Sequence, residues 1–384
     1  MNAARAARLA GSFRAAFGRG PEGFYSAPGR TELVGNHTDH QRGRVLAAAV
    51  GFDMLAAAAP NGLNTLRVIS EGQEPFEVDI SDTSPRAEER FTSAALARGI
   101  ADSLRRRGFE PRGMDIAVTS AVPVGSGLSS SAAFEVLLAC ILSGGAGPVE
   151  LAVCARRAEN EYFGKPCGLM DQLACALGGA AAIDFGADEP AIERLGFEPE
   201  RAGYAPCLVY SGAGHADLTE EYAAIEREMR AAAGFFGKSA LRYVDENDFF
   251  ANIDAVASAL GGRAALRAAH FFAEDRRAAL AASALREGDF GRFLDCVRES
   301  GRSSAVYLQN LDVPGAKERP MALTQSLCER ALAGRGAVRV HGGGFGGALL
   351  CFVPLDMLER FTAELAGRRV VRLESRAEGV VRIS

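Results

Sequence analysis

The sequence lacks any run of about 18 consecutive apolar residues, which is the length that a membrane-spanning helix needs. It also lacks an excess of positive charge, because 43 Lys and Arg stand against 48 Asp and Glu, giving a net charge of −5. Only three of those 43 basic residues are lysines. We therefore expect no membrane span and no basic surface for nucleic acid. The 384 residues, 48% of them hydrophobic, fit a soluble protein of two domains.

Paired cysteines are also missing. The eight cysteines stand singly, none of them in a Cys-x-x-Cys pattern, and most have apolar neighbours. Such cysteines are typical of buried free thiols in a reducing compartment. The stretch 1–20 has no apolar core like that of a signal peptide, and Leu9, Phe13 and Phe17 fall on one face of a predicted helix. We expect a cytoplasmic protein that is a monomer or a weak homo-oligomer.

The order of apolar and polar segments predicts two α+β domains. A change in composition near 186–206, with three prolines and several charges, marks a boundary, so the domains are placed at 1–195 and 196–384. Between apolar segments, residues 29–43 form a polar stretch that is expected to be a ligand-binding loop. Strands are predicted at 45–59, 66–70, 114–119, 208–211, 338–340 and 349–353, and helices at 91–107, 132–142, 149–163, from about 170, and through most of 217–300.

The segment Pro123–Ala133 is the most informative part of the chain. Gly125 and Gly127 let the backbone approach a ligand closely, and three serines follow at the start of an apolar helix. The free N–H groups and the dipole of such a helix end favour phosphate. A serine N-cap is the simpler interpretation, but three consecutive serines exceed what a cap requires. The segment therefore predicts a phosphate-binding loop.

Two other glycine-containing segments resemble phosphate motifs less well. Gly237-Lys238-Ser239 ends like a P-loop, but Ala232 stands where the first glycine is required. The segment Gly342–Gly347 satisfies G-x-G-x-x-G, yet a strand and not a helix is predicted after it. A functional role and a tight turn remain equally open for 342–347.

Acidic and histidine residues leave further alternatives open. Asp171, near a predicted helix start, is either a helix-dipole partner or a catalytic acid. His37, Asp39 and His40 lie close together in sequence, as metal ligands do, but their spacing matches no zinc pattern.

Taken in order, these segments resemble the galactokinases of the GHMP superfamily. The similar segments are Ala27–Asp39 (a sugar signature), Pro123–Ala133 (an ATP loop), Cys167–Gln172 (around a catalytic Asp), Glu220–Tyr222 (a sugar-contacting Tyr) and His341–Gly347 (a C-terminal glycine motif). The resemblance implies an α+β, two-domain GHMP-kinase-like architecture with the active site in the interdomain cleft. It also implies ATP-dependent phosphorylation of the anomeric C1 hydroxyl of galactose.

The resemblance further implies a role for each matching residue. Asp171 would act as general base and Arg30 would stabilise developing negative charge. Ser131 and Glu159 would ligate Mg²⁺ beside the nucleotide phosphates. The residues expected to hold the sugar are Asn36, His37, Asp39 and Tyr222, and those expected to surround the phosphates of ATP are Gly125, Ser126, Gly127, Leu128, Ser129, Ser130 and Ser131.

The sugar signature departs from the family pattern at three positions. Galactokinases usually carry Asn, Glu and Tyr where this chain has Glu32, Asn36 and His40. Asn36 would tolerate a carboxylate at C6 of the sugar, so galacturonic acid stays open as an alternative substrate. A galactose-sensing regulator without catalysis is the alternative from another class of protein.

Overall fold

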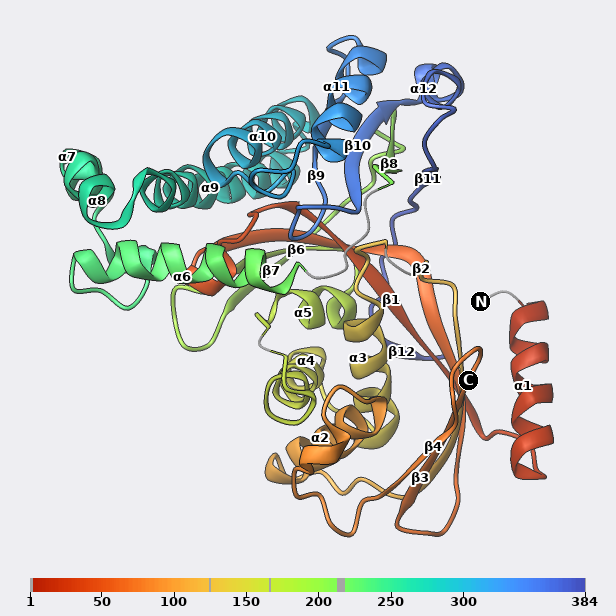
Figure 1. The fold of residues 1–384 in the computed structure, drawn as a ribbon. Helices are drawn as coiled ribbons and strands as arrows, with labels where there is room; N and C mark the ends of the chain where they lie inside the picture. Colours follow the sequence, from red (N-terminus) through yellow and green to blue (C-terminus); the bar gives the residue numbers. More distant parts are fainter. Residues whose placement is uncertain (1–2, 124–125, 166, 213–217, 384) are drawn as a thin grey trace.

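The computed structural model describes residues 3–123, 126–165, 167–212 and 218–383, and Gly125 lies outside these residues. The chain forms two sheets with helices packed around them (Figure 1). The first sheet consists of β1 (Gly23–Val34), β2 (Arg44–Pro60), β3 (Thr65–Ser70), β4 (Phe76–Asp79), β5 (Met114–Ser120), β6 (Ala180–Asp184), β7 (Ala191–Leu195) and β12 (Val381–Arg382). The second consists of β8 (Tyr204–Tyr210), β9 (Ala337–Val340), β10 (Ala348–Pro354) and β11 (Val370–Arg372).

Strand order in the first sheet is β12-β1-β2-β5-β3-β4, and β6 joins β2 to β7. Neighbouring strands are antiparallel except β3 and β5, which are parallel. The second sheet is antiparallel throughout, in the order β11-β8-β10-β9. These two sheets confirm the expected mixed fold, while the boundary at residue 195 stays a prediction.

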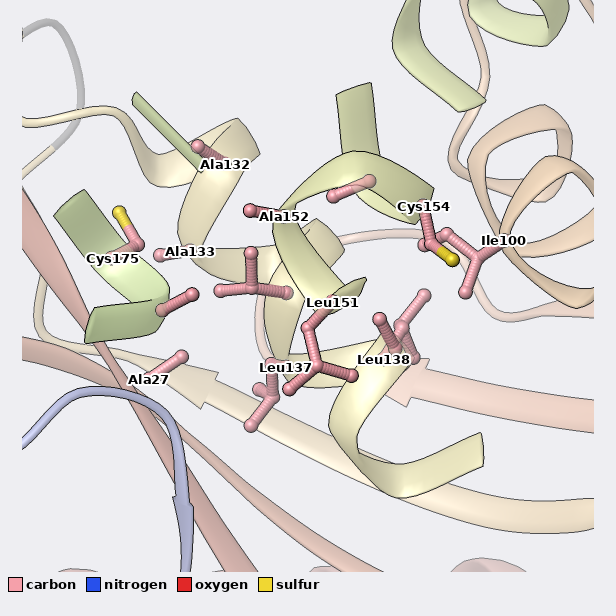
Figure 2. Close-up of a cluster of buried hydrophobic side chains, with 14 of the residues drawn as sticks. Ala27, Ile100, Ala132, Ala133, Leu137, Leu138, Leu151, Ala152, Cys154 and Cys175 are labelled. Atoms are coloured by element: carbon pink, nitrogen blue, oxygen red, sulfur yellow. The ribbon is translucent and has the colours of Figure 1, made fainter. Parts of the chain in front are cut away.

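Helices cover both faces of the first sheet. One face carries α2 (Ser93–Arg106), α3 (Ser130–Ser143), α4 (Pro148–Arg157) and α5 (Met170–Leu177), and the other carries α1 (Ala3–Phe17). The side chains of β2 alternate between the two faces: Ala56 and Ala58 join the core under α3, whereas Leu55 and Ala57 meet α1. Figure 2 shows part of the larger core, where Leu137 and Leu138 of α3 lie with Leu151 and Cys154 of α4 and Ile100 of α2.

The remaining helices are α6 (Thr219–Phe235), α7 (Glu246–Ala251), α8 (Ile253–Leu260), α9 (Gly262–Glu287), α10 (Phe290–Ser303), α11 (Pro320–Leu332) and α12 (Leu358–Glu364). Of these, α10, α11 and α12 pack on the second sheet, α9 packs on the first sheet and on α10, and α6 and α8 pack on α9 (Figure 1). A shared core joins the two sheets, because Leu46 of β2 packs with Phe293 of α10 and Phe352 of β10. The two sheets therefore share one continuous apolar core.

The expectation of a loop over 29–43 is wrong for its first part. Residues 29–34 continue β1, and Arg30 and Glu32 pair with Ala49 and Ala47 of β2. The polar side chains of this strand are buried, because each meets a partner from a distant segment: Arg30 meets Asp171 and Glu32 meets Arg339. Sequence spacing does not reveal such distant partners, so the strand looked like a loop.

The segment after β11 returns to the first sheet. Arg376 donates from its backbone N–H to the carbonyl of Ala49, and β12 then pairs with β1 at Tyr25 and Ser26. We call residues 373–382 the return segment. Within the described ranges no single helix is long and apolar enough to cross a membrane, and α3 with the helical residues 148–163 meets that test only as a pair bent by 117°.

Candidate active site

Arg30, Asp171 and Ser129 form a compact polar group. Arg30 donates from Nε to Oδ1 of Asp171 at 2.7 Å and from Nη2 to Oδ2 at 2.5 Å, and the Ser129 hydroxyl also donates to Oδ2. The Asp171 side chain stays 31% exposed, so a ligand can reach it. Burial alone would raise the pKa of Asp171, but Arg30 and Ser129 outweigh it and hold this pKa below the ordinary value. Asp171 is therefore an accessible anion at neutral pH.

The start of α3 lies beside this group. Ser129 is in the left-handed region at φ +56°, and no side chain among the described residues caps α3, because the Ser129 hydroxyl is turned to Asp171. The N-cap interpretation of the serines is therefore wrong. Ser130 and Ser131 are exposed at the helix end, where unpaired N–H groups favour an anion.

The described part of the predicted phosphate loop is fixed to β1. Arg30 donates from Nη1 to the carbonyl of Gly127, and its backbone N–H donates to the carbonyl of Leu128 at 3.0 Å. Gly127 has φ +74°, and a Cβ there would lie 2.9 Å from Nδ1 of His341. The Ser126 hydroxyl accepts from the N–H of Leu128 at 3.2 Å. Arg30 thus positions Asp171 and this loop together.

Glu159 lies in a wide helical turn, residues 158–163, that follows α4. Such π-type turns are frequent at functional sites. Its Oε1 accepts from Nζ of Lys165 at 3.2 Å, and its Oε2 accepts from Nε2 of Gln172 at 2.8 Å. Because Gln172 follows Asp171 in α5, one short helix connects the Asp171 group to Glu159.

Gln172 also donates to Oε2 of Glu135, a fully buried residue of α3, at 3.1 Å. Burial and the charge of Glu159 raise the pKa of Glu135 to about 8, so this carboxyl is neutral at pH 7. The remaining oxygens of the two groups, Glu135 Oε1 and Gln172 Oε1, are buried without a partner in the described residues. Sequence reasoning missed Glu135, because a charged residue inside a helix is usually at the surface. It also missed Lys165 and Gln172, whose partner Glu159 is not apparent from a local pattern.

The segment after β1 brings His37, Asp39 and His40 together. His37 has φ +57°, its Nε2 lies 3.1 Å from the carbonyl of Gly343, and its Nδ1 lies 3.3 Å from Nε2 of His40. A carbonyl only accepts, so Nε2 of His37 carries the proton and Nδ1 accepts from His40. Burial lowers the pKa of both histidines, so the rings are neutral at pH 7.

Asp39 lies against the segment that leads to Asp171. A Cβ at Gly168 would lie 2.0 Å from Oδ2 of Asp39, so glycine is required there. Burial, assisted by the negative charge of Glu32, raises the pKa of Asp39 to about 6. The Asp39 carboxylate accepts from the backbone N–H groups of His40 and of Asp39 itself, and no Lys, Arg or hydroxyl side chain in the described ranges bonds to it. Groups of three or more His, Cys, Asp or Glu side chains arranged to hold a metal are absent from the described residues.

Asn36 is fully engaged within the protein. Its Nδ2 donates to Oε1 of Glu32 at 3.1 Å and to the carbonyl of Gly342 at 2.9 Å. Its Oδ1 accepts from Ser304 at 3.2 Å and from Asn310 at 2.8 Å. A side-chain amide has two donors and two acceptor positions, so none remains for a sugar. This geometry does not support Asn36 as a direct sugar contact.

The backbone carbonyls of the glycine motif between β9 and β10 accept hydrogen bonds from Asn36, His37 and Tyr222. Successive carbonyls of Gly342, Gly343 and Gly344 accept from Asn36, His37 and the hydroxyl of Tyr222, the last at 3.0 Å. A Cβ at Gly343 would lie 2.4 Å from the Tyr222 ring, and one at Gly344 would lie 2.0 Å from the carbonyl of Asn310. The motif is thus a tight turn whose carbonyls hold Asn36, His37 and Tyr222 in place, and its functional role stays a prediction.

The comparisons with known proteins agree with this arrangement. Residues 11–60 match the galactokinase galactose-binding signature, and residues 95–179 match the GHMP kinase N-terminal domain. The structure resembles that of Lactococcus lactis galactokinase complexed with galactose, with a TM-score of 0.85 and 22% identity over 99% of this chain and 100% of that one. It also resembles Methanococcus jannaschii mevalonate kinase, with a TM-score of 0.64 and 15% identity over 92% and 98% of the two chains.

The fold and the matched segments define a kinase of the GHMP type. Within that class the matched segments are galactokinase-like, that is, they resemble those of ATP-using sugar kinases. The signature match contains Arg30 and the segment 36–39, and the domain match contains Ser131, Glu159 and Asp171.

Proposed function

We propose that the protein transfers the γ-phosphoryl group of ATP to the anomeric C1 hydroxyl of galactose. The observation that carries this proposal is the bidentate Arg30–Asp171 pair at the uncapped start of α3. It places an accessible carboxylate beside a helix end that favours phosphate. The galactose-binding signature over 11–60 supports galactose as the acceptor.

In this proposal the C1 hydroxyl donates a hydrogen bond to Asp171. The low pKa of Asp171, which Arg30 and Ser129 maintain, makes it a weak base. Phosphoryl transfer passes through a loose transition state, so positioning the hydroxyl matters more than removing its proton early. The proton moves to Asp171 as the oxygen–phosphorus bond forms, and Arg30 stabilises the charge on the transferred group.

The residues present fit a magnesium ion, because Ser131 and Glu159 offer the oxygen ligands that Mg²⁺ prefers. Bound Mg²⁺ would neutralise phosphate charge. In the structure Glu159 already holds a cation, the ammonium of Lys165, whose side chain is 60% exposed and free to turn away. We propose that Ser131 and Glu159 take this ligand role.

The turnover test uses MgATP with galactose, with a panel of aldoses and with uronic acids, and ³¹P NMR identifies the phosphorylated position. Asp171→Asn keeps the shape of the side chain and removes its charge. We expect it to lower kcat by about 10²–10⁴-fold and to leave ATP affinity, measured by calorimetry, nearly unchanged. Near-normal turnover of Asp171→Asn would remove Asp171 from the mechanism, and binding of galactose and ATP without any product would identify a sensing regulator instead.

The metal role has its own test with a matched control in the same turn. Glu159→Ala removes one oxygen ligand, so we expect a higher Mg²⁺ concentration for half-maximal nucleotide binding, with galactose affinity unchanged. Glu161→Ala is the control, since that side chain is 55% exposed and pairs with Arg157. Equal Mg²⁺ dependence in both variants would contradict the assignment.

A further inference from the structure

We propose that Glu32 determines the sugar specificity of this protein: it accepts a hydrogen bond from a hydroxyl of a neutral sugar and excludes sugars that carry a carboxylate there. The inference deepens the proposed function and rests on it. Glu32 lies two residues after Arg30 on β1, so the two side chains point to the same face of the strand.

The two oxygens of the Glu32 carboxylate differ in their surroundings. Oε1 accepts from the guanidinium of Arg339 and from Nδ2 of Asn36. Oε2 takes no hydrogen bond from any described residue, and it is not among the buried atoms that lack a partner, so solvent reaches it. The side chain as a whole is only 6% exposed. One fixed acceptor oxygen is therefore presented at the edge of an otherwise buried group.

The charge of Glu32 acts on the residues around the proposed sugar position. It raises the pKa of Asp39, after the larger effect of burial. It also opposes the lowering of the His37 pKa by burial and contributes to the raised pKa of Arg30. The charge of Glu32 thus acts on Asp39, His37 and Arg30 at once, which places Glu32 among the residues of the proposed sugar position. Asn36, the neighbouring polar side chain, has no hydrogen-bonding position left.

The charges around the proposed sugar position favour a neutral ligand. Glu32, Asp39 and Asp171 are acidic, whereas each cation that acts on these residues or on the two histidines is already paired to a carboxylate: Arg30, Arg339, Lys165, Arg230 and Arg267. His37, His40 and His341 are neutral, because burial lowers the pKa of each, that of His341 to about 3. Arg339 is fully buried, so it cannot turn to meet a second carboxylate. A hydroxyl donates to Glu32, while a carboxylate in its place meets like charge in a poorly solvated space.

The test measures the affinity of galactose, each monodeoxygalactose and galacturonate by calorimetry, with wild type and Glu32→Gln. In wild type we expect one deoxy sugar to bind about 10–100-fold more weakly than galactose, which is the usual loss for a hydrogen bond to a charged group. Glu32→Gln should bind galactose more weakly by a similar factor. In this variant the affinity for that deoxy sugar should equal the affinity for galactose, and the preference for galactose over galacturonate should be smaller than in wild type.

Glu274→Gln is the matched control. Glu274 is another buried acid against the same segment: it accepts from the N–H of Gly35 at 2.9 Å and pairs with Arg277. Its loss should weaken galactose and every deoxy sugar alike. Thermal unfolding checks that each variant folds, and ATP affinity should stay unchanged.

Two outcomes overturn the proposal. One is an equal loss for galactose and all deoxy sugars in Glu32→Gln, which marks a purely structural residue. The other is galacturonate binding to wild type as tightly as galactose, a result that needs no variant. Because binding is measured without turnover, a protein that binds these sugars as expected but forms no product would refute only the proposed function.

Discussion

Asp39 is a residue whose charge opposes folding. Its pKa of about 6 in the folded protein lies above the ordinary value of 3.8, so folding favours the protonated form. Below about pH 4 the group is protonated in both states and contributes nothing. Between about pH 4 and pH 6 the unfolded chain ionises while the folded protein keeps the proton, so stability falls across this range and the loss is complete above about pH 6.

We therefore expect Asp39→Asn to be more stable than wild type at pH 7.5, by about 3 kcal/mol, and equal to it near pH 4. Urea unfolding at the two pH values measures the difference. Asp254→Asn, at an exposed position in α8, is the control and should change stability little at either pH. A gain that is the same at both pH values would show that the charge is not its cause. Under the proposed function, Asp39→Asn also weakens sugar binding, because the ionised group accepts a hydroxyl.

The polar residues of the sugar signature show what the sequence could and could not reveal. The resemblance predicted that Arg30, Asp171 and the start of α3 belong to one site, and the structure places them in contact. It also assigned a sugar contact to Asn36, whose amide proves saturated by Glu32, Gly342, Ser304 and Asn310. Ser304 and Asn310 lie more than 250 residues from Asn36 in the sequence, so no local sequence pattern predicts that they are its partners.

Among the elements, the glycine motif after β9 depends most strictly on the absence of side chains. Gly343→Ala places a Cβ 2.4 Å from the Tyr222 ring, which must move. We expect an increased KM for the sugar, with the KM for ATP nearly unchanged, because the contacts of this glycine are on the sugar side. Gly367→Ala is the control, since nothing lies within 4 Å of that position. A double-mutant cycle with Tyr222→Ala should show strong coupling, and additive losses would place the effect elsewhere.

Most elements were predictable because their periodicity reflects burial on one face. The helix predicted at 91–107 is α2 at 93–106, and the strand predicted at 45–59 is β2. The strand over 29–34 was missed because its buried side chains are polar, and hydrophobic alternation does not detect polar side chains that pair across the molecule. The wide turn at 158–163 was read as ordinary helix, since one extra residue per turn leaves the apolar pattern nearly unchanged.

At the scale of the whole molecule, the return segment ties the second sheet to the first. Arg376 donates to the Ser26 hydroxyl at 2.9 Å and lies 3.3 Å from Oδ2 of Asp53. Arg376→Met leaves Asp53 with Arg5 as a partner, so we expect a loss of about 1–2 kcal/mol in the free energy of unfolding. We expect a single unfolding transition to remain, because the core of Leu46, Phe293 and Phe352 also joins the sheets.

The control for this prediction is Arg372→Met, at an exposed position of β11, which should lie within about 0.5 kcal/mol of wild type. Calorimetry and urea unfolding followed by fluorescence would both report the change. Two separate transitions in Arg376→Met would instead show that the return segment is the main link between the sheets.

The pairing of β12 with β1 also has a consequence for synthesis on the ribosome. The strand β1 precedes the other strands of both sheets in the chain, yet its outer neighbour is translated only after the whole second sheet. Until then the edge of β1 at Tyr25 and Ser26 presents unpaired backbone groups, which are a template for association with another chain. Chaperone demand should therefore fall late in translation, and slowing the ribosome between codons 373 and 382 should lower the soluble yield more than slowing it elsewhere.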